Sequence, residues 1–344
     1  MEIRFFGVRG SIPAPGPSTA RYGGNTVCVQ VTLADGTMMV FDAGTGLREL
    51  GKVLAKGGPA GPYHLLLSHI HWDHIIGLPF FGPLYNPDTH LLLYPLANEV
   101  QTKKHRKQIL FDGVHFPVRS EDIPAKLEEV NVDTAEWRIG SATVKRVGLN
   151  HPGGAQGFRV DDVDGKSFAY LTDNELSPPG VVTTAMSELA LFARDVDVLA
   201  HDAQYVSEDM PRKHGWGHST IDDALMLAKE AGTKHVVLFH HEPERDDDAL
   251  DAIDAHTKRW MRENAGGALG SVAFEGLKIT LLRVRPRPSR RGRRRTHRGR
   301  GRGTSSSRAA DRRRARRTSA RGLRGLRAAR GRGRRRRWPR GSPP

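Results

Sequence analysis

The chain has 344 residues, enough for one large domain or two ordinary ones, and a formal net charge of +16. That charge is concentrated at one end, because residues 285–344 hold 26 arginines and one acidic residue, a net charge of +25. Residues 1–284 hold 28 basic and 37 acidic side chains, a net charge of −9. The overall charge of the chain is therefore no evidence that this part binds nucleic acid. We therefore expect a folded domain over residues 1–284 and a disordered Arg/Gly-rich tail over residues 285–344.

Cysteine content and hydropathy indicate the compartment. Cys28 is the only cysteine, so an intrachain disulfide is excluded and nothing indicates an oxidising environment. The N-terminus lacks a basic segment followed by a long apolar stretch, and no apolar run reaches the eighteen residues of a membrane span. We expect a cytoplasmic protein with no membrane partner, for which a homodimer is possible and the sequence does not decide the oligomeric state.

The first hundred residues are predicted to contain several strands and one helix. Strands are expected over residues 3–8, 25–31, 37–41, 65–67 and 91–94. Between the third and fourth of these, Leu47, Leu50 and Leu54 recur at helical spacing. A basic surface helix is expected over residues 100–110.

The second part alternates strands with longer helices. Residues 137–149 alternate in polarity, and the later predicted strands are 158–163, 167–171, 196–200 and 236–239. One helix is expected from the Ser219-Thr220 cap to Gly232, a second over residues 247–264, and a last hairpin over residues 271–284. Two groups of strands, each followed by helices, predict an α+β fold in which two mixed sheets pack face to face with helices outside, a four-layer αββα sandwich.

The segment 68–74 is the strongest functional signal in the sequence. His69, His71, Asp73 and His74 follow directly after a short apolar strand. Imidazole and carboxylate groups are the ligands that suit zinc and neighbouring transition metals. Four such groups on one turn are more than one closed site needs, and they favour two adjacent metals that share a pocket.

Further candidate ligands follow later strands. His151 and Asp173 each come directly after a predicted strand, and His240 and His241 both follow the strand at 236–239. His240 is favoured over His241 because it is the first residue after the strand. Asp42, at another strand end, is predicted either as a turn residue or as the partner of a ligand imidazole.

With these residues assembled, residues 1–284 resemble the metallo-β-lactamase fold superfamily, and specifically its ribonuclease Z-like phosphodiesterase branch. The resemblance is carried by His-x-His-x-Asp-His at residues 69–74, by the Asn-His-Pro-Gly-Gly turn at His151, and by Asp173 and His240 after their strands. It implies that one metal is held by His69, His71 and His151. The other metal is implied to lie on Asp73, His74 and His240, with Asp173 bridging the two.

The same resemblance implies the cofactors and a catalytic pair. The metals would be two divalent ions, most simply Zn²⁺, with Mn²⁺ and Fe²⁺ as alternatives. The His-Glu-Ala-Thr and His-Ser-Thr motifs of the branch read here as residues 201–204 and 218–220. They imply that His218 contacts the scissile phosphate or assists the leaving group, that Asp202 orients it, and that Asp73 helps to position the attacking water.

Three departures narrow the expected substrate. Transfer-RNA-processing members insert a long arm between the equivalents of His151 and Asp173, where this chain has 21 residues. True β-lactamases of this fold use a cysteine where Asp173 stands, and Trp72 replaces the small residue common in ribonuclease Z. We therefore expect Trp72 to form part of a pocket wall, and the substrate to be small.

The sequence thus predicts a dinuclear metal-dependent phosphodiesterase for small or cyclic-nucleotide phosphodiesters, acting by attack of a metal-bridging hydroxide. One alternative keeps the metals but hydrolyses a lactone or thioester. The alternative from a different class is an RNA-binding protein that acts through the arginine-rich tail, which could contact nucleic acid without sequence preference.

Overall fold

The protein is described by a computed structural model that covers residues 1–57, 61–96, 111–210 and 212–282. Within these ranges the strands form two mixed sheets of seven strands each. The predicted helix at 100–110 and the arginine-rich tail lie outside the described residues. None of the described helices combines the length and the apolar composition that a bilayer crossing needs.

The first sheet is built mainly from the N-terminal part of the chain. Its strands, in spatial order, are β14 (Lys278–Thr280), β1 (Glu2–Gly7), β2 (Cys28–Thr32), β3 (Met38–Phe41), β4 (Tyr63–Leu66), β5 (His90–Leu93) and β6 (Lys126–Glu129). Pairing is antiparallel from β14 to β3 and parallel from β3 to β6.

The second sheet follows the same plan. Its strands, in spatial order, are β13 (Leu269–Val272), β12 (His235–Phe239), β11 (Val198–Asp202), β10 (Ser167–Leu171), β9 (Ala155–Asp162), β8 (Ala142–Leu149) and β7 (Glu136–Ile139). The pairs from β13 to β10 are parallel, and those from β10 to β7 are antiparallel.

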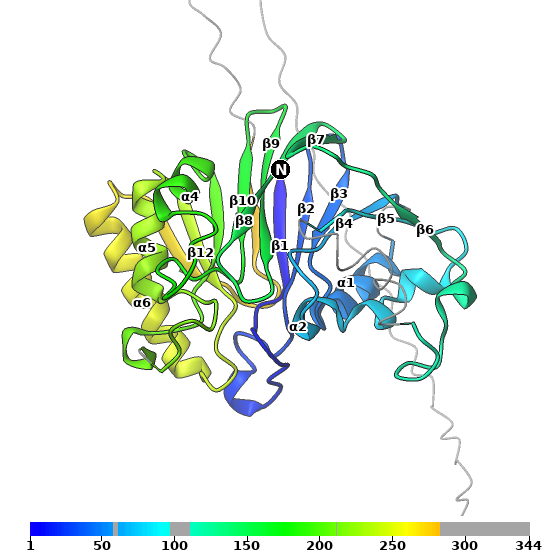
Figure 1. The fold of residues 1–344 in the computed structure, drawn as a ribbon, viewed down its shortest axis with the longest axis horizontal. Coiled ribbons are helices and arrows are strands. Elements are labelled where there is room, and N and C mark those ends of the chain that lie inside the picture. Colours follow the sequence, from blue (N-terminus) through cyan, green and yellow to red (C-terminus); the bar gives the residue numbers. More distant parts are fainter. Residues whose placement is uncertain (58–60, 97–110, 211, 283–344) are drawn as a thin grey trace, which may run out of the picture. The chain divides into compact units, whose positions relative to one another are not determined.

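Helices cover the outer faces of both sheets. They are α1 (Gly46–Leu54), α2 (Trp72–Ile75), α4 (Met186–Phe192), α5 (Ile221–Glu230) and α6 (Asp247–Asn264), with short 3₁₀ turns at Pro17–Thr19, Leu78–Phe80, Gly82–Tyr85, Ser120–Asp122 and Ser207–Asp209. Figure 1 shows α4, α5 and α6 on one side of the sheets and α1 and α2 on the other. The predicted αββα sandwich of two mixed sheets is confirmed.

Local sequence signals explain where the long helices begin. The Thr220 side chain accepts a hydrogen bond from the Asp223 backbone N–H, which caps α5, and Asp246 caps α6 through the Ala249 N–H. Such caps satisfy amide groups that the first helical turn leaves unpaired. Gly232, with φ of +66°, follows α5 in the left-handed conformation that ends helices.

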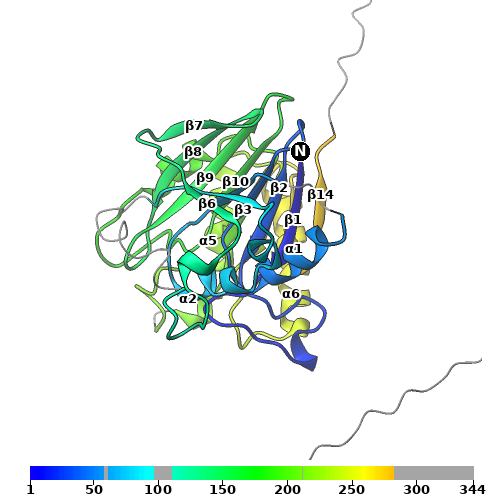
Figure 2. The ribbon, with the colours of Figure 1, turned by 90° about the vertical axis from the view of Figure 1, so that its right-hand side faces the viewer.

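Two sequence predictions are corrected by the strand pairing. The predicted hairpin at 271–284 does not form, because β13 pairs parallel with β12 while β14 crosses over and pairs with β1 in the other sheet. Figure 2 shows β14 beside β1. The alternating segment 137–149 is two antiparallel strands, β7 and β8, separated by Gly140 at φ of +50°. Sequence alternation fixes which face a residue takes but not its pairing partner.

The space between the sheets is filled by aromatic side chains. Phe41 on β3 contacts three rings of the opposite sheet, with centroid distances of 5.6 Å to Phe158, 5.7 Å to Phe168 and 5.3 Å to Tyr170. All four residues are buried. Aromatic pairs at such distances add to the free energy gained from burial. This cluster holds the two sheets, and therefore their ends, together.

Replacing Phe41 by alanine should destabilise the protein by about 3–5 kcal/mol, because it leaves a cavity between the sheets. Denaturant unfolding of the variant and the wild type measures the difference. The matched control is Phe274→Ala, at a ring that is 41% exposed, for which we expect a loss of about 1 kcal/mol or less. Equal losses for the two variants would contradict this description of the core.

Candidate metal centre

The site is built from strand ends that meet at one edge of the sandwich. Asp42 and His69 follow β3 and β4, and Asp173 and His240 follow β10 and β12. Within each sheet these strands run parallel, so their carboxyl ends lie at the same edge. His151 joins them because β8 is antiparallel to β9, which is in turn antiparallel to β10.

Three of these junctions use an unusual backbone conformation. Asp42, Asp173 and His240 have φ of +59°, +46° and +61°, in the left-handed region that residues other than glycine seldom occupy. Each such residue costs on the order of 1–3 kcal/mol, and the conformation persists because contacts with the surrounding structure compensate for that cost. The strain is therefore located where side chains must turn sharply from a strand into the site.

The site places two groups of donor atoms side by side. The groups are His69, His71, His151 and Asp173, and Asp73, His74, Asp173 and His240. Within each group the donor atoms lie within 4.8 Å of one another. All seven residues proposed as ligands from the sequence are therefore gathered at one place.

Asp173 belongs to both groups and divides its two oxygens between them. Its Oδ1 lies 3.1 Å from His74 Nε2 and 3.2 Å from His240 Nε2. Its Oδ2 lies 3.6 Å from His69 Nε2 and 3.7 Å from His151 Nε2. This is the arrangement of a carboxylate that can bridge two cations.

Four of the imidazoles are oriented through their other ring nitrogen. The partners of Nδ1 are Ser68 Oγ for His69 (3.0 Å), Asp42 Oδ2 for His74 (2.9 Å), the Gly217 carbonyl for His151 (3.0 Å) and Gln204 Oε1 for His240 (2.9 Å). A proton held on Nδ1 leaves the lone pair of Nε2 free to face the site.

The donors fit divalent cations. Among the described residues, His69 Nε2 and His74 Nε2 are buried without a hydrogen-bond partner, although carboxylate oxygens lie nearby. His71 Nδ1 and His151 Nε2 lie 3.1 Å apart and are directed at the same space. Several buried acceptors converging in this way are costly unless a cation lies among them. Nitrogen and carboxylate donors suit Zn²⁺, Mn²⁺ or Fe²⁺.

The electrostatics of the two groups differ. Burial lowers the pKa of His69, His71 and His151, so these imidazoles are neutral at pH 7 and present lone pairs. Burial also opposes the charged form of His240, but Asp173 and Asp73 outweigh it and raise its pKa to about 9. The carboxylates therefore draw positive charge into this half of the site.

The choice between His240 and His241 is decided by the opposite directions of their side chains. His240 Nε2 lies 3.3 Å from Asp73 Oδ2 inside the site. His241 donates from Nε2 to the Ala273 carbonyl at 2.9 Å and packs against the Tyr22 ring. His240 is thus the one that lies within the donor group.

The proposed catalytic pair lies beside both groups. His218 Nδ1 is 2.6 Å from Asp202 Oδ2, so aspartate in place of glutamate still reaches the imidazole. The His218 ring is stacked 5.0 Å from His240 and lies 5.3 Å from His151. Asp73, the third residue proposed as catalytic, accepts a 2.7 Å hydrogen bond from the Ser11 N–H.

Several supporting residues were missed by sequence reasoning. Tyr170 donates its hydroxyl to Asp42 Oδ2 at 2.7 Å, but a tyrosine in the middle of β10 is indistinguishable from core in the sequence. Gln204 holds His240 and in turn donates to Glu242 Oε2 at 2.8 Å. The position of Gln204 at the end of the 201–204 motif was the signal in the sequence that could have indicated this role. For Asp42, the structure selects the second predicted role, the partner of an imidazole.

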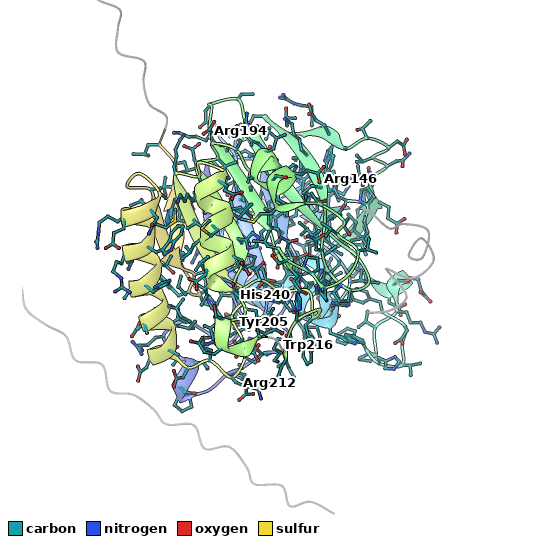
Figure 3. The ribbon with its side chains drawn as sticks, turned by 60° about the vertical axis from the view of Figure 1, so that its left-hand side comes forward. Arg146, Arg194, Tyr205, Arg212, Trp216 and His240 are labelled. Carbon is teal, nitrogen blue, oxygen red and sulfur yellow. The ribbon has the colours of Figure 1, made fainter. Side chains whose placement is uncertain are left out.

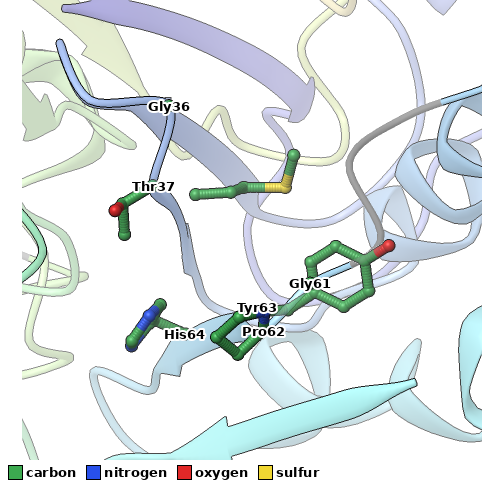
Figure 4. A pocket seen from close by; sticks show the side chains of 7 residues that line it. Gly36, Thr37, Gly61, Pro62, Tyr63 and His64 are labelled. Carbon is green, nitrogen blue, oxygen red and sulfur yellow. The ribbon is translucent and has the colours of Figure 1, made fainter. Parts of the chain in front are cut away.

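Figure 4 shows a separate pocket of about 200 Å³ that includes Gly36, Thr37, Pro62 and His64. These residues lie at the amino ends of β3 and β4. The donor groups lie at the carboxyl ends of the same strands, so this pocket is not part of the metal centre.

Comparison with known proteins agrees with this geometry. Residues 37–241, more than half of the chain, match the family model described as a beta-lactamase superfamily domain. The chain belongs to the metallo-β-lactamase superfamily. As a member of this superfamily it is a metal-dependent hydrolase, and the resemblance inferred from the sequence is confirmed.

The curated relatives of this superfamily member include ribonucleases Z from several organisms. That of Haloarcula marismortui is 23% identical over 304 residues, which cover 74% of this chain and 92% of the relative. That of Halalkalibacterium halodurans is 25% identical over 277 residues, which cover 70% and 87%.

Solved structures share the metallo-β-lactamase fold. A diphosphatase from the PhnP family has a TM-score of 0.58 and 20% identity, over 82% of this chain and 98% of its own. The short form of human tRNase Z has a TM-score of 0.53 and 20% identity, over 82% and 100%. At these identities the structural likeness supports the fold alone.

Asp42→Asn should weaken metal binding about 10- to 100-fold, because the partner that orients His74 loses its charge. Competition with a zinc indicator measures the affinity. Asp88→Asn, an exposed aspartate in a turn, is the matched control and should bind zinc like the wild type. A zinc affinity for Asp42→Asn within twofold of the control would contradict this role.

Proposed function

We propose that the protein is a two-metal phosphodiesterase that acts on small phosphodiesters. The observation that carries the proposal is the division of the Asp173 oxygens between two donor groups, with the His218–Asp202 pair beside them. Two cations so placed would stabilise the attacking and leaving oxygens of a phosphoryl displacement. The name of the curated relatives, ribonuclease Z, supports the same reaction class.

The protein's own residues have distinct roles in this proposal. Asp173 and Asp73 concentrate negative charge that would bind the cations, and the Ser11 N–H donates a hydrogen bond that fixes the Asp73 carboxylate. His218 has its Nδ1 engaged by Asp202, so its remaining nitrogen is the one that can bind a phosphate oxygen or give a proton to the leaving oxygen. The His218 ring contacts His151 from one donor group and His240 from the other, so a proton transfer by His218 would take place next to both groups.

A small substrate is favoured by the segment between His151 and Asp173. A glycine turn, β9, a short connection and β10 use this segment almost completely, so it contains no additional arm. Trp72, at the start of α2, is 58% exposed and belongs on the surface around the site.

The zinc- or manganese-loaded full-length protein should hydrolyse bis-p-nitrophenyl phosphate. His69→Ala and Asp173→Ala should each lower kcat/KM at least tenfold, because each removes a donor of the site. His256→Ala, at a half-exposed histidine on α6, is the matched control and should retain activity. Hydrolysis of lactones or thioesters with none of phosphodiesters would instead select the acyl-ester alternative.

His218→Ala should lower kcat by about 10²–10⁴-fold. The metal content should stay unchanged, because the variant keeps every donor of the two groups that share Asp173, although His218 also forms a third possible donor group with Asp202 and His240. If His218 protonates the leaving oxygen, the loss should be larger for a phosphodiester with an alkyl leaving group than for one with p-nitrophenol. Steady-state kinetics on both substrates measure this. An equal loss on both would assign His218 to phosphate binding rather than proton transfer.

A further inference from the structure

An exposed tryptophan, Trp216, lies next in the chain to a residue that contacts the donor groups. The proposed reaction gives this tryptophan no role. Trp216 is 56% exposed and stands between Gly215 and Gly217. The Gly217 carbonyl accepts the hydrogen bond from His151 Nδ1 at 3.0 Å, so the next residue along the chain from Trp216 touches a proposed metal ligand. Figure 3 labels Trp216 together with Tyr205 and His240, and Tyr205 is connected to His240 through the His218 ring.

The backbone on both sides of Trp216 is fixed. The buried carboxylate of Glu175 accepts from Gly215 N at 2.8 Å and from Gly217 N at 2.9 Å. Both glycines have positive φ, of +88° and +87°, which other residues adopt only with strain. A Cβ at Gly217 would lie 2.2 Å from His151 Nδ1, so glycine is also required for the close approach. The backbone that carries the indole is therefore held in place.

A row of aromatic contacts connects the catalytic pair to this tryptophan. The Tyr205 ring lies 5.6 Å from the His218 ring, and Lys213 Nζ lies 5.3 Å from the Tyr205 centroid. The same ammonium lies 4.3 Å from the Trp216 centroid, where it covers one face of the indole. Its ion pair with Glu242 is long, at 3.9 Å, which leaves the positive charge available to an anionic ligand.

We propose that Trp216 and Lys213 form a subsite that binds an aromatic base attached to the phosphodiester. The base stacks on the indole face that Lys213 does not cover, and the ammonium attracts the phosphate side of the ligand. This inference rests on the proposed function and narrows it to nucleoside phosphodiesters. Trp216 is a specificity-determining residue, since it favours substrates with a ring over those without one.

Two substrates with the same leaving group test the subsite in the full-length, zinc-loaded protein. They are thymidine 5′-(p-nitrophenyl phosphate) and methyl p-nitrophenyl phosphate. Trp216→Ala should raise KM for the thymidine ester about tenfold, the range expected for one stacked base, and change KM for the methyl ester less than twofold. Trp216→Phe should retain most of the preference. Equal KM values for the two esters in the wild type would overturn the inference and leave the phosphodiesterase proposal intact.

Calorimetric binding gives a readout that needs no turnover. Thymidine 5′-monophosphate should bind the wild type about tenfold more tightly than methyl phosphate, and Trp216→Ala should remove that difference. If neither ester is hydrolysed, the phosphodiesterase proposal fails, and this titration still decides the subsite. A thymidine preference that persists in Trp216→Ala and disappears in Trp72→Ala would overturn the inference, because the base would then stack on the other exposed indole.

Discussion

The carboxylate of Asp173 is the interaction on which the site depends. It follows β10 in a left-handed conformation, and its two oxygens face histidines from both sheets. A single charged group shared in this way requires that the carboxyl ends of β4, β8, β10 and β12 be held in register. The aromatic rings packed between the sheets supply that constraint, because each donor group takes residues from both sheets and movement of one sheet against the other would pull each group apart.

A second layer of contacts determines which nitrogen each histidine presents. Asp42 fixes His74 and is itself held by Tyr170, so the hydrogen-bond chain crosses from one sheet to the other. Gln204 and the Gly217 carbonyl fix the rings of His240 and His151 in the same way, through a hydrogen bond at Nδ1. Such partners fix the ring orientation and increase the basicity of the nitrogen that faces a cation. The Gly217 contact also places the backbone next to Trp216 against His151, so the proposed ligand and the proposed base subsite are neighbours.

Much of this arrangement could be predicted from the sequence, because its signals are local. Residues 69–74 crowd four donors onto one turn, and His151, Asp173 and His240 each follow a strand. The features that could not be predicted depend on pairing between distant segments. The expected C-terminal hairpin does not form, because β13 pairs with β12 in parallel. Glu175 accepts hydrogen bonds from Gly215 and Gly217, which lie about forty residues further along the chain. Tyr170 resembles any buried aromatic residue until Asp42 is placed beside its hydroxyl.

If Asp173 serves both donor groups, the chain binds two divalent cations. Elemental analysis of the purified, zinc-saturated protein after removal of weakly bound metal tests it most directly. We predict close to two zinc ions per chain for the wild type and one or fewer for Asp173→Ala. A wild-type content of one or fewer ions per chain, unchanged in Asp173→Ala, would contradict the account.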